Sequence, residues 1–116
     1  DMKMLYEQNG RWVERLNRWF KNHVIDPKED IEQLKKTSPN FHIDKIKAPL
    51  FIVHGRKDYN VRIEQAETLM DALDKKNIPY EVLIKKEEGH GFVLEENRIE
   101  LYSRMQTFFN ENLAKN

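Results

Sequence analysis

Two short polar segments contain the residues whose types are best suited to chemistry. Asp58 follows the apolar run 50–53 (LFIV), and His90 lies between two glycines after the stretch 80–84 (YEVLI). A carboxylate that accepts a hydrogen bond from one imidazole nitrogen fixes the tautomer and leaves the other nitrogen free to act as a general base. The flanking glycines are expected to let the loop bend sharply and to present the ring without crowding. Together these residues predict an acid and histidine pair.

Two strands are expected to bring Asp58 and His90 to the same edge of a sheet. The run 50–53 is unbroken in apolar residues, which is typical of a strand buried on both faces, and 80–84 predicts a second strand. The segment between them has its apolar residues on one side and predicts an amphipathic helix that ends near Asn77. Active groups gather at the carboxyl ends of parallel strands, so the loops after the two strands should lie side by side.

Further helices are expected on either side of this unit. Aromatic and apolar residues recur at helical spacing within 102–113, and a similar aromatic stripe occurs in the first twenty residues. Between the first twenty residues and the strand at 50–53, a capping box made by Asp26 and Glu29 is expected to begin a short helix that runs to about Lys36.

The order strand, helix, strand, helix predicts an α/β fold with parallel strands. Only two strands are convincing, and two parallel strands have too little partnered backbone to stand alone. The strand at 50–53 should therefore have neighbours on both sides in a larger sheet. If the chain is studied alone, we expect its exposed strand edge to be covered in a symmetric homodimer.

Composition narrows the classes of function. A chain of 116 residues is one domain or part of one, because domains usually have ~100–200 residues. The 20 Lys and Arg residues balance 20 Asp and Glu residues, so nucleic acid and anionic membranes are not expected as partners. The sequence has no cysteine, which excludes disulfides, thiol nucleophiles and zinc-thiolate sites. No apolar run approaches the ~20 residues that span a bilayer, and no signal peptide is recognised at the N-terminus. The compartment stays open, with the cytoplasm favoured.

Several short motifs occur in a fixed order along the chain. They are Ser38-Pro39, the segment 46–55 (IKAPLFIVHG), the segment 58–61 (DYNV), the segment 88–92 (EGHGF) and the segment 96–98 (ENR). In this order and spacing they resemble the C-terminal part of the prolyl oligopeptidase family of serine peptidases, in particular its acylaminoacyl-peptidase-like and dipeptidyl-peptidase-like members. The resemblance covers nearly the whole chain. It implies a partial α/β-hydrolase fold that consists of the last two parallel strands with flanking helices.

The resemblance implies roles for four residues. Asp58 matches the triad aspartate and His90 the triad histidine of an α/β-hydrolase, in which the chain order is serine, acid, histidine. Asn60 and Val61 match a pair that lies beside the substrate in dipeptidyl-peptidase-like relatives, where the asparagine helps to hold a substrate carbonyl.

The nucleophile that this order requires has no match in the sequence. The chain has two serines, Ser38 and Ser103, and neither lies in the Gly-x-Ser-x-Gly turn that projects a nucleophile. We therefore expect residues 1–116 to be the C-terminal segment of a peptidase catalytic domain whose serine lies upstream of Asp1. This segment alone is expected to be inactive.

The leading hypothesis is a serine-type peptidase that acts by acyl transfer on peptide substrates and needs no metal or organic cofactor. An esterase or another small-molecule hydrolase on the same fold is the nearest alternative, and a non-catalytic α/β interaction module is the second. His54, Asp58 and His90 together offer nitrogen and oxygen donors that suit zinc, but a cluster without a helical histidine pair is weak evidence for a metal site. His54 is expected to be packed or hydrogen-bonded rather than reactive.

Overall fold

The computed structural model describes Met4, Arg18, residues 21–23, Asp26 and residues 29–113. The chain divides into two compact units, Asp1–Ile46 and Lys47–Asn116. The aromatic stripe predicted to form a helix in the first twenty residues lies outside the described residues. Within the described part, no helix is long and apolar enough to cross a membrane.

The described part of the first unit is a short helix followed by two helical turns. Helix α3 (Ile31–Thr37) leads into the 3-10 helices η1 (Pro39–Phe41) and η2 (Ile43–Lys45). Ser38 ends α3 in an extended conformation, as predicted, because the residue before a proline is pushed out of the helical region.

The start of α3 differs from the prediction. The helix begins at Ile31 with Asp30 as its N-cap, so the expected capping box of Asp26 and Glu29 is wrong. The backbone N–H of Asp30 donates to the carbonyl of Asp26 at 2.8 Å, and the Asp30 carboxylate accepts the N–H of Asp26 at 3.1 Å. These two bonds join Asp26 to Asp30, and α3 begins at the residue after Asp30.

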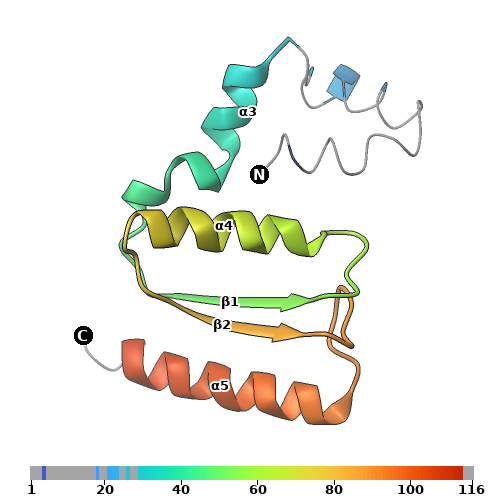
Figure 1. Cartoon of the computed structure of the whole chain (residues 1–116), viewed down its shortest axis with the longest axis vertical. Coiled ribbons are helices and arrows are strands. Elements are labelled where there is room, and N and C mark those ends of the chain that lie inside the picture. The colour runs from blue at the N-terminus through green and yellow to red at the C-terminus, as the bar shows by residue number, and fades with distance from the viewer. Residues whose placement is uncertain (1–3, 5–17, 19–20, 24–25, 27–28, 114–116) are drawn as a thin grey trace. The chain divides into compact units, whose positions relative to one another are not determined.

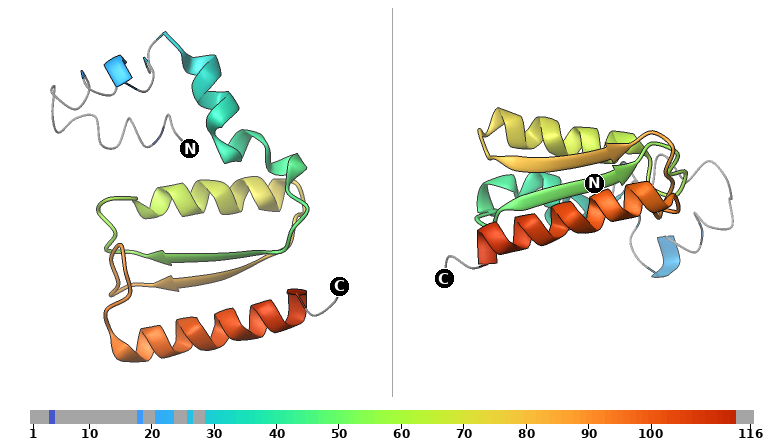
Figure 2. Two further views of the ribbon diagram at one scale, coloured as in Figure 1. Left: turned by 180° about the vertical axis from the view of Figure 1, so that it is seen from behind. Right: turned by 90° about the horizontal axis from the view of Figure 1, so that it is seen from below.

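The second unit contains a parallel two-stranded sheet with one helix on each face. Strand β1 (Leu50–Gly55) pairs with β2 (Tyr80–Lys85) in a register that runs from Leu50 opposite Tyr80 to Gly55 opposite Lys85. Helix α4 (Ile63–Lys75) covers one face and helix α5 (Glu95–Leu113) the other (Figure 1). The view from behind shows that both strands end at the same edge, where the loops to α4 and α5 leave the sheet (Figure 2). The predicted α/β architecture is confirmed.

Helix α4 packs on the sheet through the predicted apolar side. Ala66 and Leu73 on this side are buried. The helix ends in a Schellman motif, in which the N–H of Ile78 donates to Leu73 and the N–H of Asn77 donates to Asp74, both at 3.0 Å. Asn77 has a φ of 52°, the left-handed conformation that this motif requires and that asparagine tolerates. The predicted helix end near Asn77 is confirmed.

Helix α5 packs on the sheet through an aromatic pair and a cation–π contact. The ring of Phe108 lies 5.6 Å from the ring of Phe51, and the guanidinium of Arg104 lies 5.1 Å from the same Phe51 ring. Arg104 also donates a hydrogen bond of 3.0 Å to the carbonyl of Val82 in β2. The predicted stripe is only partly covered, since Tyr102 and Leu113 are exposed.

Strand β1 is less buried than its unbroken apolar sequence predicts. Its first five residues are half-buried, and only Gly55 is buried. In the part of the chain that the structure describes, the sheet has two strands, so β1 has a partner on one edge only. The predicted homodimer through the other edge stays a prediction.

Candidate active site

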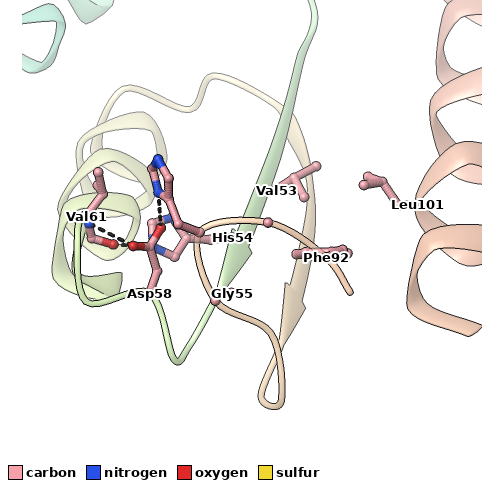
Figure 3. A pocket seen from close by; sticks show the side chains of 10 residues that line it. Val53, His54, Gly55, Asp58, Val61, Phe92 and Leu101 are labelled. Carbon is pink, nitrogen blue, oxygen red and sulfur yellow. Dashed lines mark hydrogen bonds and ion pairs between the residues drawn. The ribbon is translucent and has the colours of Figure 1, made fainter. Parts of the chain in front are cut away.

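The loop after β1 is built around the carboxylate of Asp58. Its atom Oδ1 accepts the backbone N–H groups of Asn60 at 2.9 Å and Val61 at 2.8 Å, and the N–H of Asp58 itself donates to Gly55 at 3.1 Å. Figure 3 shows the carboxylate directed at Val61 from the turn that follows Gly55. An aspartate that binds the backbone two residues further on forms an Asx turn. The carboxylate therefore organises the turn in which it lies.

The same carboxylate reaches His90 in the loop after β2. The Nδ1 atom of His90 lies 2.8 Å from Oδ2 of Asp58, as expected from parallel strands that end level with each other. Two backbone bonds join the loops near this contact, from Arg56 N–H to the Lys85 carbonyl and from Lys57 N–H to the Glu88 carbonyl. The side chain of Asp58 is 6% exposed, whereas that of His90 is 61% exposed.

The surroundings of Asp58 favour its charged form. Burial by itself would raise the pKa of Asp58, but the N–H groups of Val61 and Asn60 and the hydrogen bond and charge of His90 outweigh it and lower the pKa below its ordinary value. An ionised carboxylate can only accept, so the Nδ1 atom of His90 must carry the proton in this bond. The tautomer that results leaves Nε2 with a free lone pair, as a general base needs.

His54 lies on the other side of Asp58 and supports the same loop. Its Nε2 atom is 2.8 Å from the carbonyl of Val61 and 4.0 Å from Oδ2 of Asp58. Since a carbonyl can only accept, Nε2 of His54 is the protonated nitrogen and donates to Val61. His54 is thus hydrogen-bonded, as predicted. Among the described residues, no group of three or more His, Asp or Glu side chains is arranged to hold a metal ion.

A cavity of about 350 Å³ opens beside the pair (Figure 3). It extends from the end of β1 across both loops to the first half of α5. The residues that line it are Val53, His54, Gly55, Asp58, Val61, Gly89, His90, Gly91, Phe92 and Leu101. Of the two residues predicted to lie beside a substrate, Val61 is part of this lining, whereas Asn60 is exposed and is not.

The glycine that the site requires is Gly55, which the sequence did not single out. A Cβ at Gly55 would lie 2.4 Å from the carbonyl oxygens of Glu88 and Gly89, too close for any side chain. A Cβ at Gly89 would make an ordinary contact, a Cβ at Gly91 would meet nothing within 4 Å, and no glycine in the described residues has a positive φ. The loop bends at His90 and Gly91 and leaves the ring exposed, as predicted, but the close approach that admits no side chain occurs at Gly55, at the end of β1.

Glu88 is a second residue that the sequence did not single out. Its side chain is fully buried two residues before His90, and its carboxylate accepts three hydrogen bonds from the start of α5 and the preceding residues. Nothing in the pair Glu87-Glu88 tells which glutamate is buried. The sequence carries no local signal for this burial, because only the folded loop brings the donors of Val93, Leu94 and Asn97 to Glu88.

The fold and the site together define the class of the protein. A parallel strand pair flanked by helices, with an acid after the first strand and a histidine after the second, is part of the α/β-hydrolase fold. The two serines of the chain, which the sequence did not match to a nucleophile, have structural positions. Ser38 is fully buried and donates to the carbonyl of Leu34 at 2.7 Å, and Ser103 lies within α5.

Comparisons with known proteins give the family. The chain matches the prolyl oligopeptidase family over residues 1–116. It is 32% identical over 90 residues to dipeptidyl peptidase family member 6 of Caenorhabditis elegans, and the match covers 78% of this chain and 12% of that protein. It is 36% identical over 74 residues to dipeptidyl aminopeptidase BIII of Pseudoxanthomonas mexicana, covering 62% of this chain and 11% of that protein. The chain belongs to the prolyl oligopeptidase family, as its motifs predicted.

A solved structure agrees with this assignment. The acylaminoacyl peptidase of Pyrococcus horikoshii superposes with a TM-score of 0.74 at 29% identity, over 85% of this chain and 17% of that chain. In each of these comparisons, the chain spans less than a fifth of the length of the protein it matches.

Proposed function

We propose that residues 1–116 are the C-terminal segment of the catalytic domain of a serine-type peptidase, which cleaves peptides by acyl transfer. Asp58 and His90 are its acid and histidine, and the nucleophilic serine belongs to a part of the peptidase outside this chain. The observation that carries the proposal is the 2.8 Å hydrogen bond between a buried carboxylate and a histidine that is otherwise exposed. The family match and the small share of each relative's length that the chain spans support it.

In this proposal His90 moves the proton during acylation and again when water releases the acyl group, taking a proton from the water and returning it to the serine. Its Nε2 atom takes the proton from the serine hydroxyl as the serine attacks the peptide carbonyl, and later delivers it to the leaving amine. Asp58 keeps the proton of the neutral ring on Nδ1 and stabilises the imidazolium that forms. Val61 and Asn60 contact the substrate, and the Asx turn of Asp58 fixes the backbone of both. No step requires a metal or an organic cofactor.

The test is a substitution of the proposed base in the full-length peptidase. His90→Ala should lower kcat by at least about three orders of magnitude, because no other group could take the serine proton. Thermal unfolding should change little, since the His90 side chain is mostly exposed. His23→Ala, at an exposed position of the first unit, is the matched control. Turnover by His90→Ala at a near-normal rate would contradict the proposal.

Two further measurements separate the proposal from its alternatives. Parallel assays with peptide and ester substrates show whether the enzyme is a peptidase or an esterase, which Asp58 and His90 do not decide. Labelling of the full-length protein by a fluorophosphonate probe reports an activated serine, and its absence would favour a non-catalytic module. The 116-residue chain alone should neither turn over substrate nor react with the probe.

A further inference from the structure

A buried carboxylate that the proposed mechanism does not use lies two residues before His90. The side chain of Glu88 is 0% exposed, although charged side chains are almost never fully buried unless they have partners. We infer that Glu88 is a positioning residue, which holds the loop of His90 against the loop of Asp58 so that the two side chains meet. The inference rests on the proposed function of His90.

The carboxylate of Glu88 fixes the chain on the far side of His90. Its Oε2 atom accepts the N–H of Val93 at 2.8 Å, and its Oε1 atom accepts the N–H of Leu94 at 3.0 Å and the amide of Asn97 at 2.8 Å. The three donors follow His90 in the sequence, whereas Glu88 precedes it. These bonds therefore close residues 88–94 into a ring that carries His90, and they join this ring to the first turn of α5 through the side chain of Asn97.

The backbone of Glu88 fixes the chain on the side of Asp58. Its carbonyl accepts the N–H of Lys57, the residue directly before Asp58, at 2.8 Å. The same carbonyl packs on Gly55 so closely that a Cβ there would lie 2.4 Å away. One residue thus contacts both loops, through its side chain in one direction and through its main chain in the other.

The neighbouring acid shows that the burial of Glu88 is specific. Glu87 is 63% exposed at its side chain and pairs with Lys57 at 2.9 Å, an ordinary surface ion pair. At Glu88, burial would raise the pKa, but the N–H of Val93, the amide of Asn97, the N–H of Leu94 and the charge of Arg98 lower it below the ordinary value. Glu88 is therefore ionised at neutral pH, so it acts as an acceptor for these donors and does not exchange protons with substrate.

The consequence for His90 follows from its exposure. An imidazole that is 61% exposed has few packing contacts to direct it, so its position relative to Asp58 depends on the backbone of its loop. Without the Glu88 carboxylate, residues 88–94 are no longer closed into a ring. The hydrogen bond between Nδ1 of His90 and Oδ2 of Asp58 is then formed for a smaller part of the time. The imidazolium that forms during the reaction is then less stabilised, which lowers kcat. KM should change less than kcat, because Glu88 itself does not line the cavity, although four residues of its loop do.

The experiment compares three variants of the full-length peptidase with the wild type. Glu88→Ala should lower kcat on the order of 10- to 100-fold, the effect of misplacing a catalytic group by about an ångström, with KM within about three-fold. Glu88→Gln should show smaller changes of the same kind, because the amide keeps one acceptor but turns a donor toward another N–H. Glu87→Gln should behave as the wild type.

Each outcome decides the inference. A folded Glu88→Gln variant with lower kcat and with KM within about three-fold of the wild type supports it, also if Glu88→Ala does not fold. Wild-type kcat in Glu88→Gln overturns it, as does a loss of activity that lies wholly in KM or in unfolding. If neither Glu88 variant folds, Asn97→Ala, which removes one donor to the carboxylate, is tested through kcat and KM in the same way. Normal turnover by His90→Ala would instead refute the proposed function, so the two failures can be told apart.

Discussion

The two loops at the end of the sheet are stabilised in opposite ways. The loop of Asp58 is organised by the functional residue itself, whose Oδ1 atom binds two backbone N–H groups of the same turn. The loop of His90 is organised by a different residue, Glu88, while the imidazole remains largely exposed. The acid is therefore buried and organises its own turn, whereas the histidine is exposed and its loop is organised by Glu88, two residues earlier.

This difference matches the different tasks that we propose for the two side chains. The acid has to stay charged and in one orientation, which a turn with two N–H donors to the carboxylate provides. The histidine has to exchange protons with a serine and a leaving amine, so its second nitrogen cannot be taken up by structural bonds. Glu88 allows this separation, because it carries the structural bonds that the imidazole cannot make.

The Asp58 carboxylate has two roles: it binds the N–H groups of its own turn, and it accepts the hydrogen bond from Nδ1 of His90. The largest expected effect comes from Asp58→Asn, which separates these roles. In Asp58→Asn the amide oxygen can still accept the N–H groups of the turn, but the amide nitrogen then faces Nδ1 of His90 and forces the proton onto Nε2. We expect kcat of the full-length peptidase to fall on the order of 10⁴-fold, because the histidine is in the wrong tautomer. Thermal unfolding should stay close to that of the wild type.

Asp58→Ala sharpens the same comparison, because it removes both roles at once. Its kcat should fall to a similar level, but its melting temperature should also fall, since the turn loses both of its side-chain hydrogen bonds. Equal melting temperatures for the Asn and Ala variants would show that the loop of Asp58 does not depend on its own carboxylate.

An intermediate effect is expected from separating the two loops at their closest contact. In Gly55→Ala the new methyl group would lie 2.4 Å from the carbonyl oxygens of Glu88 and Gly89, so the backbone of one loop has to move. We expect a loss of stability of about 1–3 kcal/mol, typical of overpacking, and a lower kcat, measured by denaturant unfolding and steady-state kinetics. Gly89→Ala is the control for stability, since its methyl group would make an ordinary contact of 3.6 Å. Equal stability of the two variants would contradict the tight contact at Gly55.

The smallest expected effect is a dependence of stability on acidic pH. The pKa values of Asp58 and Glu88 in the folded protein lie below their ordinary values of 3.8 and 4.5, because hydrogen-bond donors favour the charged carboxylates. The unfolded chain then binds more protons than the folded chain in this range, so the two groups stabilise the fold above about pH 4.5 and this contribution is lost as the pH falls through the folded pKa values. Melting temperatures measured from about pH 3 to about pH 7 should drop at the acidic end.

The comparison of variants assigns this drop to Glu88. Glu88→Gln has one titrating group fewer, so its melting temperature should depend less on pH between about pH 3 and about pH 5 than that of the wild type. Glu64→Gln, at an exposed position in the first turn of α4, should follow the wild type. Parallel curves for Glu88→Gln and the wild type would show that the Glu88 carboxylate does not stabilise the fold.

Local rules predicted β1, α4 and β2 to within a few residues, whereas α5 begins at Glu95, before the predicted stripe at 102–113. The continuous apolar run became β1, the helix after it ends at Lys75, two residues before Asn77, and the parallel order of the strands follows from the helix between them. In the first unit, the same local rules placed the start of α3 too early. Asp26 offered a good cap, but the helix begins after Asp30.

The sequence by itself determined the strand order and, through it, the approach of Asp58 and His90, because parallel strands joined by one crossover must end at the same edge. It also determined the family, through motifs that occur in a fixed order. Only the tertiary structure decided which of two adjacent glutamates is buried and which glycine admits no side chain. Those properties depend on contacts between the residues around positions 55, 88 and 94, and no local pattern encodes distances across separate loops.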